Sequence, residues 1–223
     1  GEAEQRQFQA GYYGEINHID EQIGRILASV PANTLIIFCA DHGEMLGDHQ
    51  WVRKTRALEG SARIPFAMRL PPSLGIPQGR DQQNPREEVV ELMDIMPTCL
   101  EAAGVPIPDT VDGQSLIARL RGESGWREYL HGEQCGLGGE PHTGMQYLTD
   151  GKRKYIWEPG NGRELFFNLE EDPRETVNLA DDPAAAAEVD TWRQRLIAKL
   201  QDRPEGFVQN GQLVKLDQPT RRV

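Results

Sequence analysis

The feature that most constrains the fold is the apolar run "TLIIFCA" at residues 34–40, which is followed at once by a cluster of charged side chains. A continuous apolar run of this length is typical of a strand buried on both faces of a parallel sheet. Residues 8–30 precede it with apolar side chains at steps of three and four, and Pro31 ends this helix pattern. A helix followed by a buried strand predicts an α/β fold.

Two further segments fit this first part of the chain. The run "IPFAMRLP" reads as a second short strand that is closed by Pro71 and Pro72. The segment "VVELMDIMPTCLEAAGV" begins extended and then becomes helical, with Pro97 in the first turn and Gly104 as the stop signal. We therefore expect a first domain over residues 1–124, which is part of an α/β sheet.

After about residue 125 the pattern changes to short strand-like runs separated by turn residues, "WREYLHGE", "GMQYLTD", "RKYIWEP" and "ELFFNLE". They predict a small antiparallel sheet, and a helix pattern over 184–201 should pack on it. This second domain should span residues 125–202. Residues 203–223 are polar and contain two prolines, so they read as a tail or as a strand that depends on partners elsewhere.

Composition excludes some functions. The formal net charge is −11, which argues against nucleic-acid binding, and no apolar run approaches the roughly 18 residues of a membrane-spanning helix. Cys39, Cys99 and Cys135 form no C-x-x-C pair and no even disulfide set. This usage favours a cytoplasmic over a periplasmic location, although it fits both.

Candidate chemistry lies directly behind the apolar strand. Asp41 and His42 follow it, and ligands of open α/β sheets bind at the carboxyl ends of strands. Their side chains suit a divalent cation, because calcium prefers oxygen ligands and a histidine extends the choice to manganese, zinc or iron. Lys54 can bind a sulfate or phosphate group, and His49 can act as a proton donor or outer-shell group. The alternative is a helix cap with a structural histidine and a solvated lysine.

Three motifs carry a resemblance to a known family. They are "ADHGEMLGDHQWVRK" with "LEGSARIP", then "VVELMDIMPTCLEAAGVPIPDTVDGQSLIARLRGE", and finally "ELFFNLEEDPRETVNLA". In this order they resemble the sulfatase family of the alkaline phosphatase superfamily, in particular bacterial sulfatases, choline sulfatases and phosphonate monoester hydrolases. The resemblance covers most of the chain and implies the C-terminal part of an alkaline-phosphatase-like α/β sandwich, followed by a small antiparallel sheet with a packed helix.

The resemblance also implies roles for individual residues. Asp41 and His42 match two metal ligands of the family, and calcium is the expected metal, with manganese as the alternative. Lys54 matches the lysine that binds the sulfate and stabilises the leaving oxygen. His49 falls in the G-D-H element and is a second candidate catalytic residue.

The family's nucleophile, a formylglycine made from Cys or Ser in C/S-x-P-x-R, has no match in this sequence. None of the three cysteines fits, and after Ser29 and Pro31 the arginine position holds Asn33. We therefore expect this chain to be a C-terminal portion that is inactive alone. Its partners should be the N-terminal half of the same enzyme and, through uncovered apolar faces, further copies of itself.

The predicted function is metal-dependent hydrolysis of a sulfate ester, either a small molecule or a sulfated sugar. Two alternatives stay open: hydrolysis of a phosphonate monoester or phosphodiester, and a non-catalytic domain that keeps the fold. His131, Glu133 and His142 could line the substrate pocket or be residues of a sheet edge or surface.

Overall fold

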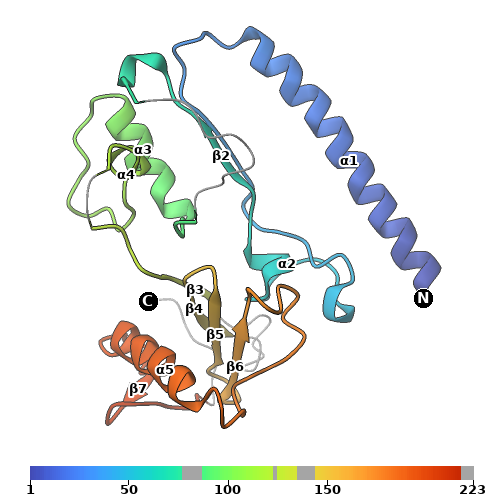
Figure 1. The fold of residues 1–223 in the computed structure, drawn as a ribbon, viewed down its shortest axis with the longest axis vertical. Coiled ribbons are helices and arrows are strands. Elements are labelled where there is room, and N and C mark those ends of the chain that lie inside the picture. The colour runs from blue at the N-terminus through green and yellow to red at the C-terminus, as the bar shows by residue number, and fades with distance from the viewer. Residues whose placement is uncertain (77–86, 123–124, 135–143, 217–223) are drawn as a thin grey trace. The chain divides into compact units, whose positions relative to one another are not determined.

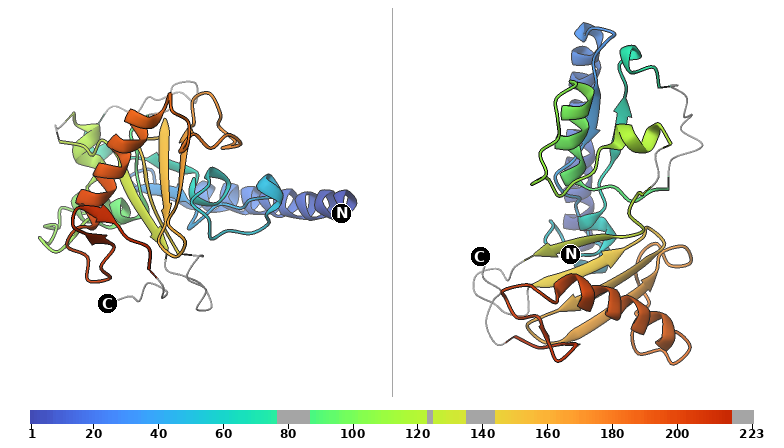
Figure 2. Two further views of the ribbon diagram at one scale, coloured as in Figure 1. Left: turned by 90° about the horizontal axis from the view of Figure 1, so that it is seen from below. Right: turned by 90° about the vertical axis from the view of Figure 1, so that its left-hand side faces the viewer.

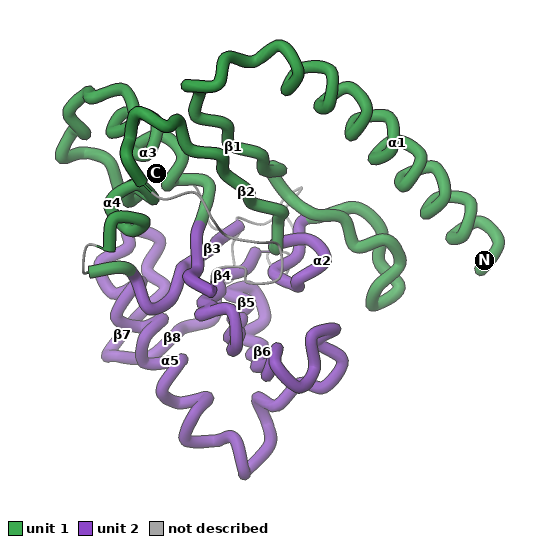
Figure 3. The backbone as a smooth tube through the Cα atoms, turned by 45° about the horizontal axis from the view of Figure 1, so that its top comes forward, with its two compact units in different colours: residues 1–54, 63–86, 91–126 green, residues 55–62, 87–90, 127–223 purple. Residues whose placement is uncertain are grey.

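The computed structural model describes residues 1–76, 87–122, 125–134 and 144–216. It divides into two compact units: one comprises residues 1–54, 63–86 and 91–126, and the other comprises residues 55–62, 87–90 and 127–223 (Figure 3). The mixed α/β composition that the sequence predicts is confirmed (Figure 1). Within the described ranges, no helix has the length and apolar character that crossing a membrane requires.

The first unit contains the predicted helix and both predicted strands. Helix α1 spans Glu2–Ser29, strand β1 spans Ile36–Cys39 and strand β2 spans Phe66–Arg69. Strands β1 and β2 pair antiparallel, with Phe38 opposite Ala67. The short 3-10 helices η1 (Asp48–Gln50) and η2 (Pro72–Leu74) lie in the loops around this pair.

The burial predicted for the apolar strand is wrong for the structure as described. The side chain of Phe38 is 44% exposed, and no residue of β1 is buried. The only strand paired with β1 among the described residues is β2, so the expected parallel sheet is absent there. Two strands cannot cover both faces of their own ladder, and this explains the exposure. The same holds for α1, whose apolar stripe stays open at Ile16, Ile19 and Ile26.

A buried aspartate organises the second half of this unit. Helix η3 (Leu92–Asp94) leads into α3 (Ile95–Ala102), and α4 (Leu116–Leu120) follows. Asp94 is fully buried, and its two carboxylate oxygens accept hydrogen bonds from the backbone N–H groups of Glu91 (3.0 Å) and Gln114 (2.9 Å). The Thr98 hydroxyl donates to the Asp94 carbonyl and accepts from the Leu116 N–H at 2.9 Å. These bonds hold the "DGQSL" turn against α3.

Gly113 in that turn leaves no room for a side chain. A Cβ atom there would lie 2.0 Å from the carbonyl oxygen of Met93, a backbone atom that cannot move aside alone. We expect Gly113→Ala to lower the free energy of unfolding by about 3 kcal/mol, the upper range for overpacking. Urea unfolding of the variant measures it. Gly24→Ala in α1, where no atom lies within 4 Å, is the matched control. A loss for Gly113→Ala no larger than for Gly24→Ala would contradict this account.

The second unit is the predicted antiparallel sheet with its helix. Strands β3 (Leu130–Gln134), β4 (Met145–Thr149), β5 (Arg153–Glu158) and β6 (Arg163–Asn168) pair in sequence order, and α5 spans Ala186–Leu200. Helix α5 lies across one face of this sheet, as the orange helix over the yellow strands in Figure 2 shows. The predicted inward residues of α5 are all buried: Val189, Trp192, Leu196 and Leu200.

Both faces of this sheet carry a core. Toward α5 the sheet contributes Leu148, Tyr155, Trp157 and Phe166. The opposite face buries Met145, Ile156, Leu165 and Phe167 together with Ala57. Ala57 lies two residues before the short helix α2 (Glu59–Ala62). The stretch after α5 also contributes, because Phe207 is fully buried with its ring edge-on to Trp157 at 5.8 Å between centroids. A small hairpin of β7 (Val208–Gln209) and β8 (Gln212–Leu213) follows it.

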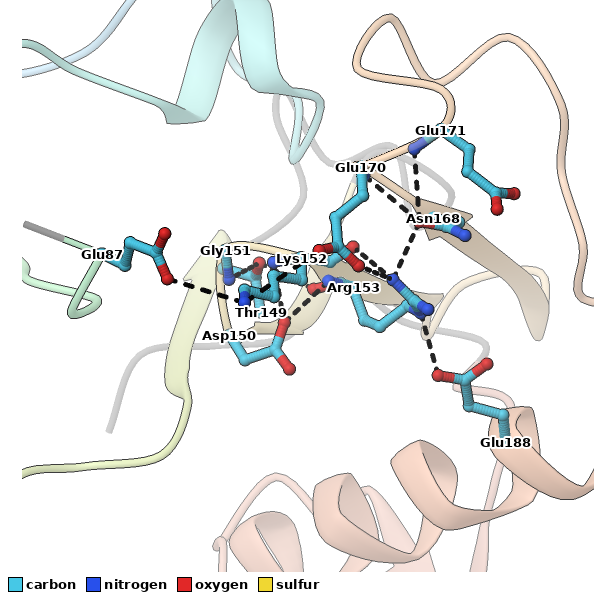
Figure 4. A network of polar contacts seen from close by, with 10 residues as sticks. All are labelled: Glu87, Thr149, Asp150, Gly151, Lys152, Arg153, Asn168, Glu170, Glu171 and Glu188. Atoms are coloured by element: carbon cyan, nitrogen blue, oxygen red, sulfur yellow. Dashed lines mark hydrogen bonds and ion pairs between the residues drawn. The ribbon is translucent and has the colours of Figure 1, made fainter. Parts of the chain in front are cut away.

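The "ELFFNLEEDPRETVNLA" segment stabilises this unit through its polar side chains. Arg153 of β5 donates to Asn168 (2.8 Å), Glu170 (3.0 Å) and Glu188 of α5 (2.9 Å), so it links the sheet to its helix (Figure 4). Strand β6 is an edge strand, and Asn178 Oδ1 accepts the Phe166 N–H at 2.9 Å. The free edge is thereby paired by its own chain, which protects it from other strands.

His131 gives this unit a pH dependence. Burial lowers its pKa from the ordinary value of 6.5, against the opposing hydrogen bond with Gln146 and the charge of Glu133. Between pH 6.5 and the lowered pKa the unfolded chain binds a proton that the folded chain does not, so stability falls as the pH falls. We expect His131→Gln to flatten this acid limb in urea unfolding monitored by near-UV circular dichroism. His18→Gln in α1 is the control, and equal slopes in wild type and His131→Gln would contradict the assignment.

Candidate active site

Asp41 and His42 lie just after the end of β1, outside any helix or strand. Hydrogen bonds with neighbouring residues orient their side chains. The Asp41 carboxylate accepts the His42 backbone N–H at 2.9 Å, and its other oxygen lies 3.5 Å from His42 Nε2. The side chain of Asp41 is 84% exposed and that of His42 is 40% exposed. Carboxylate and imidazole thus face the same space and remain accessible to a ligand.

The hydrogen bond of His42 Nδ1 determines the protonation of His42 Nε2 in the neutral ring. His42 Nδ1 lies 2.8 Å from the carbonyl oxygen of Gly43, which can only accept, so Nδ1 carries the proton. In the neutral ring Nε2 is then a lone-pair donor beside the Asp41 carboxylate. Histidine ligands of metals are oriented in this way by a hydrogen bond from the other ring nitrogen. The pair therefore fits a divalent cation in both chemistry and orientation.

Two ligands make an incomplete site. Within the described part of the chain, no group of three or more His, Cys, Asp or Glu side chains gathers around one point. A calcium ion takes about six to eight oxygen ligands, so Asp41 and His42 could hold one only together with further groups.

Glu44 closes the loop that carries the predicted anion-binding lysine. Its Oε1 accepts the backbone N–H groups of Leu46, at 3.2 Å, and of Arg53. The Met45 N–H donates to the Arg53 carbonyl at 2.8 Å, so the two ends of the loop pair. Because of this pairing, the backbone at Lys54 lies beside that of Glu44. Glu44 itself is two residues after His42 in the sequence. Lys54 itself is exposed.

His49 occupies the opposite end of this loop. It is exposed in η1, where Gly47 N–H donates to the Trp51 carbonyl at 2.7 Å and closes the tip. The backbone pairing thus returns Lys54 beside Glu44 and Met45, whereas His49 lies at the tip of the loop. A catalytic role for His49 stays a prediction, as do the roles of the other three residues.

The loop backbone is strained. Five non-glycine residues adopt positive φ angles in this short stretch: Leu46 (51°), His49 (52°), Gln50 (62°), Arg53 (71°) and Thr55 (78°). Such angles cost about 1–3 kcal/mol each and persist where surrounding contacts impose them, often at functional sites. The sequence gives no sign of them, because none of these residue types except histidine favours a left-handed backbone.

Glu44 is the one residue of this region whose role in closing the loop the sequence did not predict. Glu44 lies two residues after His42 in the pattern D-H-G-E, but its bond to the Arg53 N–H depends on the return of the chain nine residues later.

Of the three residues considered for the substrate pocket, His131, Glu133 and His142, the structure describes the first two. His131 Nε2 and Glu133 bind Gln146, at 2.8 and 3.2 Å, and Arg203 binds Glu133 at 3.0 Å. They thus belong to a polar network of the small sheet. His142 lies outside the described residues.

Comparison with known proteins agrees with this arrangement of motifs. Residues 47–202 match the family model described as N-sulphoglucosamine sulphohydrolase, C-terminal. The chain is 41% identical to an arylsulfatase from Clostridium perfringens, over 92% of this chain and 43% of that protein. It is 36% identical to the multifunctional alkaline phosphatase superfamily protein PehA from Trinickia caryophylli, over 88% of this chain and 41% of that protein.

A solved structure gives the same picture. The phosphonate monoester hydrolase of Agrobacterium radiobacter superposes with a TM-score of 0.69 at 28% identity, over 95% of this chain and 45% of that chain. The chain spans about two fifths of the length of the curated relatives that it matches. Because the family model covers well over half of the chain, the chain belongs to the sulphohydrolase C-terminal family and, with it, to the sulfatases of the alkaline phosphatase superfamily.

Proposed function

We propose that the enzyme to which this chain contributes hydrolyses sulfate esters, with Asp41 and His42 as metal ligands and Lys54 as the anion-binding residue. The observation that carries the proposal is the pair of lone-pair donors at 3.5 Å, His42 Nε2 and the Asp41 carboxylate, with the histidine tautomer fixed by Gly43. The closed loop, which returns the backbone at Lys54 beside Glu44, two residues after His42, supports it. Membership of the sulfatase family supplies the reaction class.

The residues of this chain would divide the work by charge. Asp41 and His42 would hold a divalent cation, calcium in the first instance, which offsets negative charge on the transferred sulfuryl group. Lys54 would place its ammonium group against the sulfate and the oxygen of the leaving alcohol, where charge develops in the transition state. Glu44 would keep the two ends of the loop together. The nucleophile, a formylglycine, would come from a part of the enzyme other than this chain.

A turnover assay tests the proposal. The full-length enzyme is incubated with 4-nitrophenyl sulfate and with a sulfated sugar, with calcium, with manganese and after chelation. We expect turnover of a sulfate ester that requires the metal, and none from the 223-residue chain alone, because no Cys or Ser in it stands in C/S-x-P-x-R. Turnover by the isolated chain that survives Asp41→Ala would show that the site is misplaced.

A phosphonate monoester is the second candidate substrate. The likeness to the Agrobacterium phosphonate monoester hydrolase, which extends over 95% of this chain, favours keeping it. Phenyl hydrogen phenylphosphonate is therefore assayed beside the sulfate ester under the same conditions. A kcat/KM for the phosphonate well above that for every sulfate ester would move the assignment to this second reaction.

A further inference from the structure

The segment that follows Lys54 belongs to the unit of the small sheet. Residues 55–62 group with that unit although the residues on either side of them do not (Figure 3). Ala57 is 3% exposed and lies in the core on the sheet face opposite α5, with Leu58 packed beside it. Lys54 and Thr55 are joined by a peptide bond, so whatever holds this segment sets one end of the loop that carries Lys54.

A cluster of three charges fixes the segment on the sheet. Lys154 of β5 is fully buried, and its Nζ lies 2.5 Å from Glu59 Oε1 and 3.0 Å from Glu175 Oε1. The other oxygen of Glu175 accepts the backbone N–H of Glu59 at 2.6 Å. The carboxylate of Glu175 therefore holds both the ammonium group and the start of α2, while Glu59 pairs with the same ammonium group.

This arrangement is costly, which calls for an explanation. The side chain of Glu175 is only 1% exposed, and burial raises its pKa despite the neighbouring charge of Lys154. Its backbone also adopts a φ of 57°, uncommon for a glutamate. Buried ion pairs give little net stability compared with apolar residues of similar volume. We infer that this cluster serves the geometry that it specifies rather than net stability.

We propose that Lys154, Glu175 and Glu59 are positioning residues that anchor residues 55–62 to the sheet and thereby hold Lys54 in register for catalysis. This inference rests on the role of Lys54 in the proposed function. It assigns a purpose to Glu175 of the "DPRETVNLA" segment. Shifts of about 1 Å in a catalytic group can cost about a hundredfold in rate, so an anchor of this kind has a measurable effect.

The test removes both buried charges together in the full-length enzyme, as Lys154→Met/Glu175→Gln. Replacing a buried pair by uncharged groups of similar size is often neutral for stability, so the fold should persist. The control is Arg193→Met/Glu164→Gln, which removes a bidentate ion pair of the same unit, with distances of 2.6 and 2.8 Å. Amide hydrogen exchange by mass spectrometry reports on residues 50–62, and steady-state kinetics use 4-nitrophenyl sulfate and phenyl sulfate.

We expect exchange of residues 55–62 to become about tenfold faster in the first double variant and to stay unchanged in the control. Because Lys54 stabilises the leaving oxygen, kcat should fall about tenfold for phenyl sulfate, the poorer leaving group, and less for 4-nitrophenyl sulfate. In a Lys54→Ala background the same double variant should cause no further loss, since coupled residues are not additive.

The other possible results each contradict one part of the proposal: the anchor, its effect on catalysis, or the proposed function. Unchanged exchange of residues 55–62 overturns the anchor, whatever the enzyme hydrolyses. Faster exchange with an equal loss for both substrates, or with a loss that adds to that of Lys54→Ala, assigns the cluster a structural role only. A wild-type enzyme without turnover of any sulfate ester overturns the proposed function and the catalytic consequence with it, while the exchange data still judge the anchor.

Discussion

Replacing Lys54 with alanine in the full-length enzyme should lower kcat for an aryl sulfate by about 10²- to 10³-fold, the effect of losing one preorganised donor to a developing oxyanion. The lysine is exposed in this structure, so its removal should change the unfolding free energy by no more than about 0.5 kcal/mol. The change should appear in kcat and kcat/KM alike, because the interaction is strongest in the transition state.

Steady-state kinetics with 4-nitrophenyl sulfate and phenyl sulfate measure this loss, with thermal unfolding as the check on folding. Lys215→Ala removes another exposed lysine, in the unit of the small sheet, and should leave the kinetics unchanged. A kcat for Lys54→Ala within threefold of wild type would remove Lys54 from the mechanism and leave Asp41, His42 and His49 as the candidate residues of this region.

The sequence predicts element type well where the signal is local. The alternating runs predicted the strands of the small sheet, and the spacing of Val189, Trp192 and Leu196 predicted the buried face of α5. The structure contains both. Gly104 likewise ends the helical segment of α3 as expected, with a left-handed φ of 69°. Each of these features depends on hydrogen bonds or periodicity within a few residues, which a single sequence contains.

Burial is harder to predict because it depends on a partner. The run "TLIIF" forms a strand as its composition indicates, but Phe38 stays exposed since only β2 pairs with β1 among the described residues. Lys154 shows the converse. A lysine side chain ordinarily reaches solvent, yet this one is fully buried, and Glu59 and Glu175, which are distant from it in the sequence, pair with it.

In the candidate site, too, contacts between sequence neighbours were predictable, whereas contacts that depend on distant residues were not. Asp41 and His42 are sequence neighbours, so their contact could be anticipated from the motif alone. The return of the backbone at Lys54 to the neighbourhood of Glu44 depends on the Glu44 side chain, whose bond to the Arg53 amide spans nine residues. The positive φ angles of the loop could not be anticipated, because they arise from the closure itself rather than from residues that prefer such angles.

Replacing Asp41 with alanine should change the metal requirement of the full-length enzyme rather than only its rate. Asp41 supplies one of the two lone-pair donors that face each other at 3.5 Å, so its loss leaves His42 as the single ligand from this chain. The calcium concentration for half-maximal activity should rise at least as much as for loss of an outer-shell partner, about 10- to 100-fold. His42→Ala should act in the same direction.

Activity measured across a calcium titration separates this effect from that of Lys54. High calcium should restore part of the activity of Asp41→Ala, because its defect is weaker metal binding, whereas Lys54→Ala should keep the wild-type midpoint and stay slow at every concentration. Asp20→Ala removes an exposed carboxylate from α1 and should match wild type. If Asp41→Ala keeps the wild-type midpoint, Asp41 is not a metal ligand, and its bond to the His42 amide is the helix-cap-like role that the sequence left open.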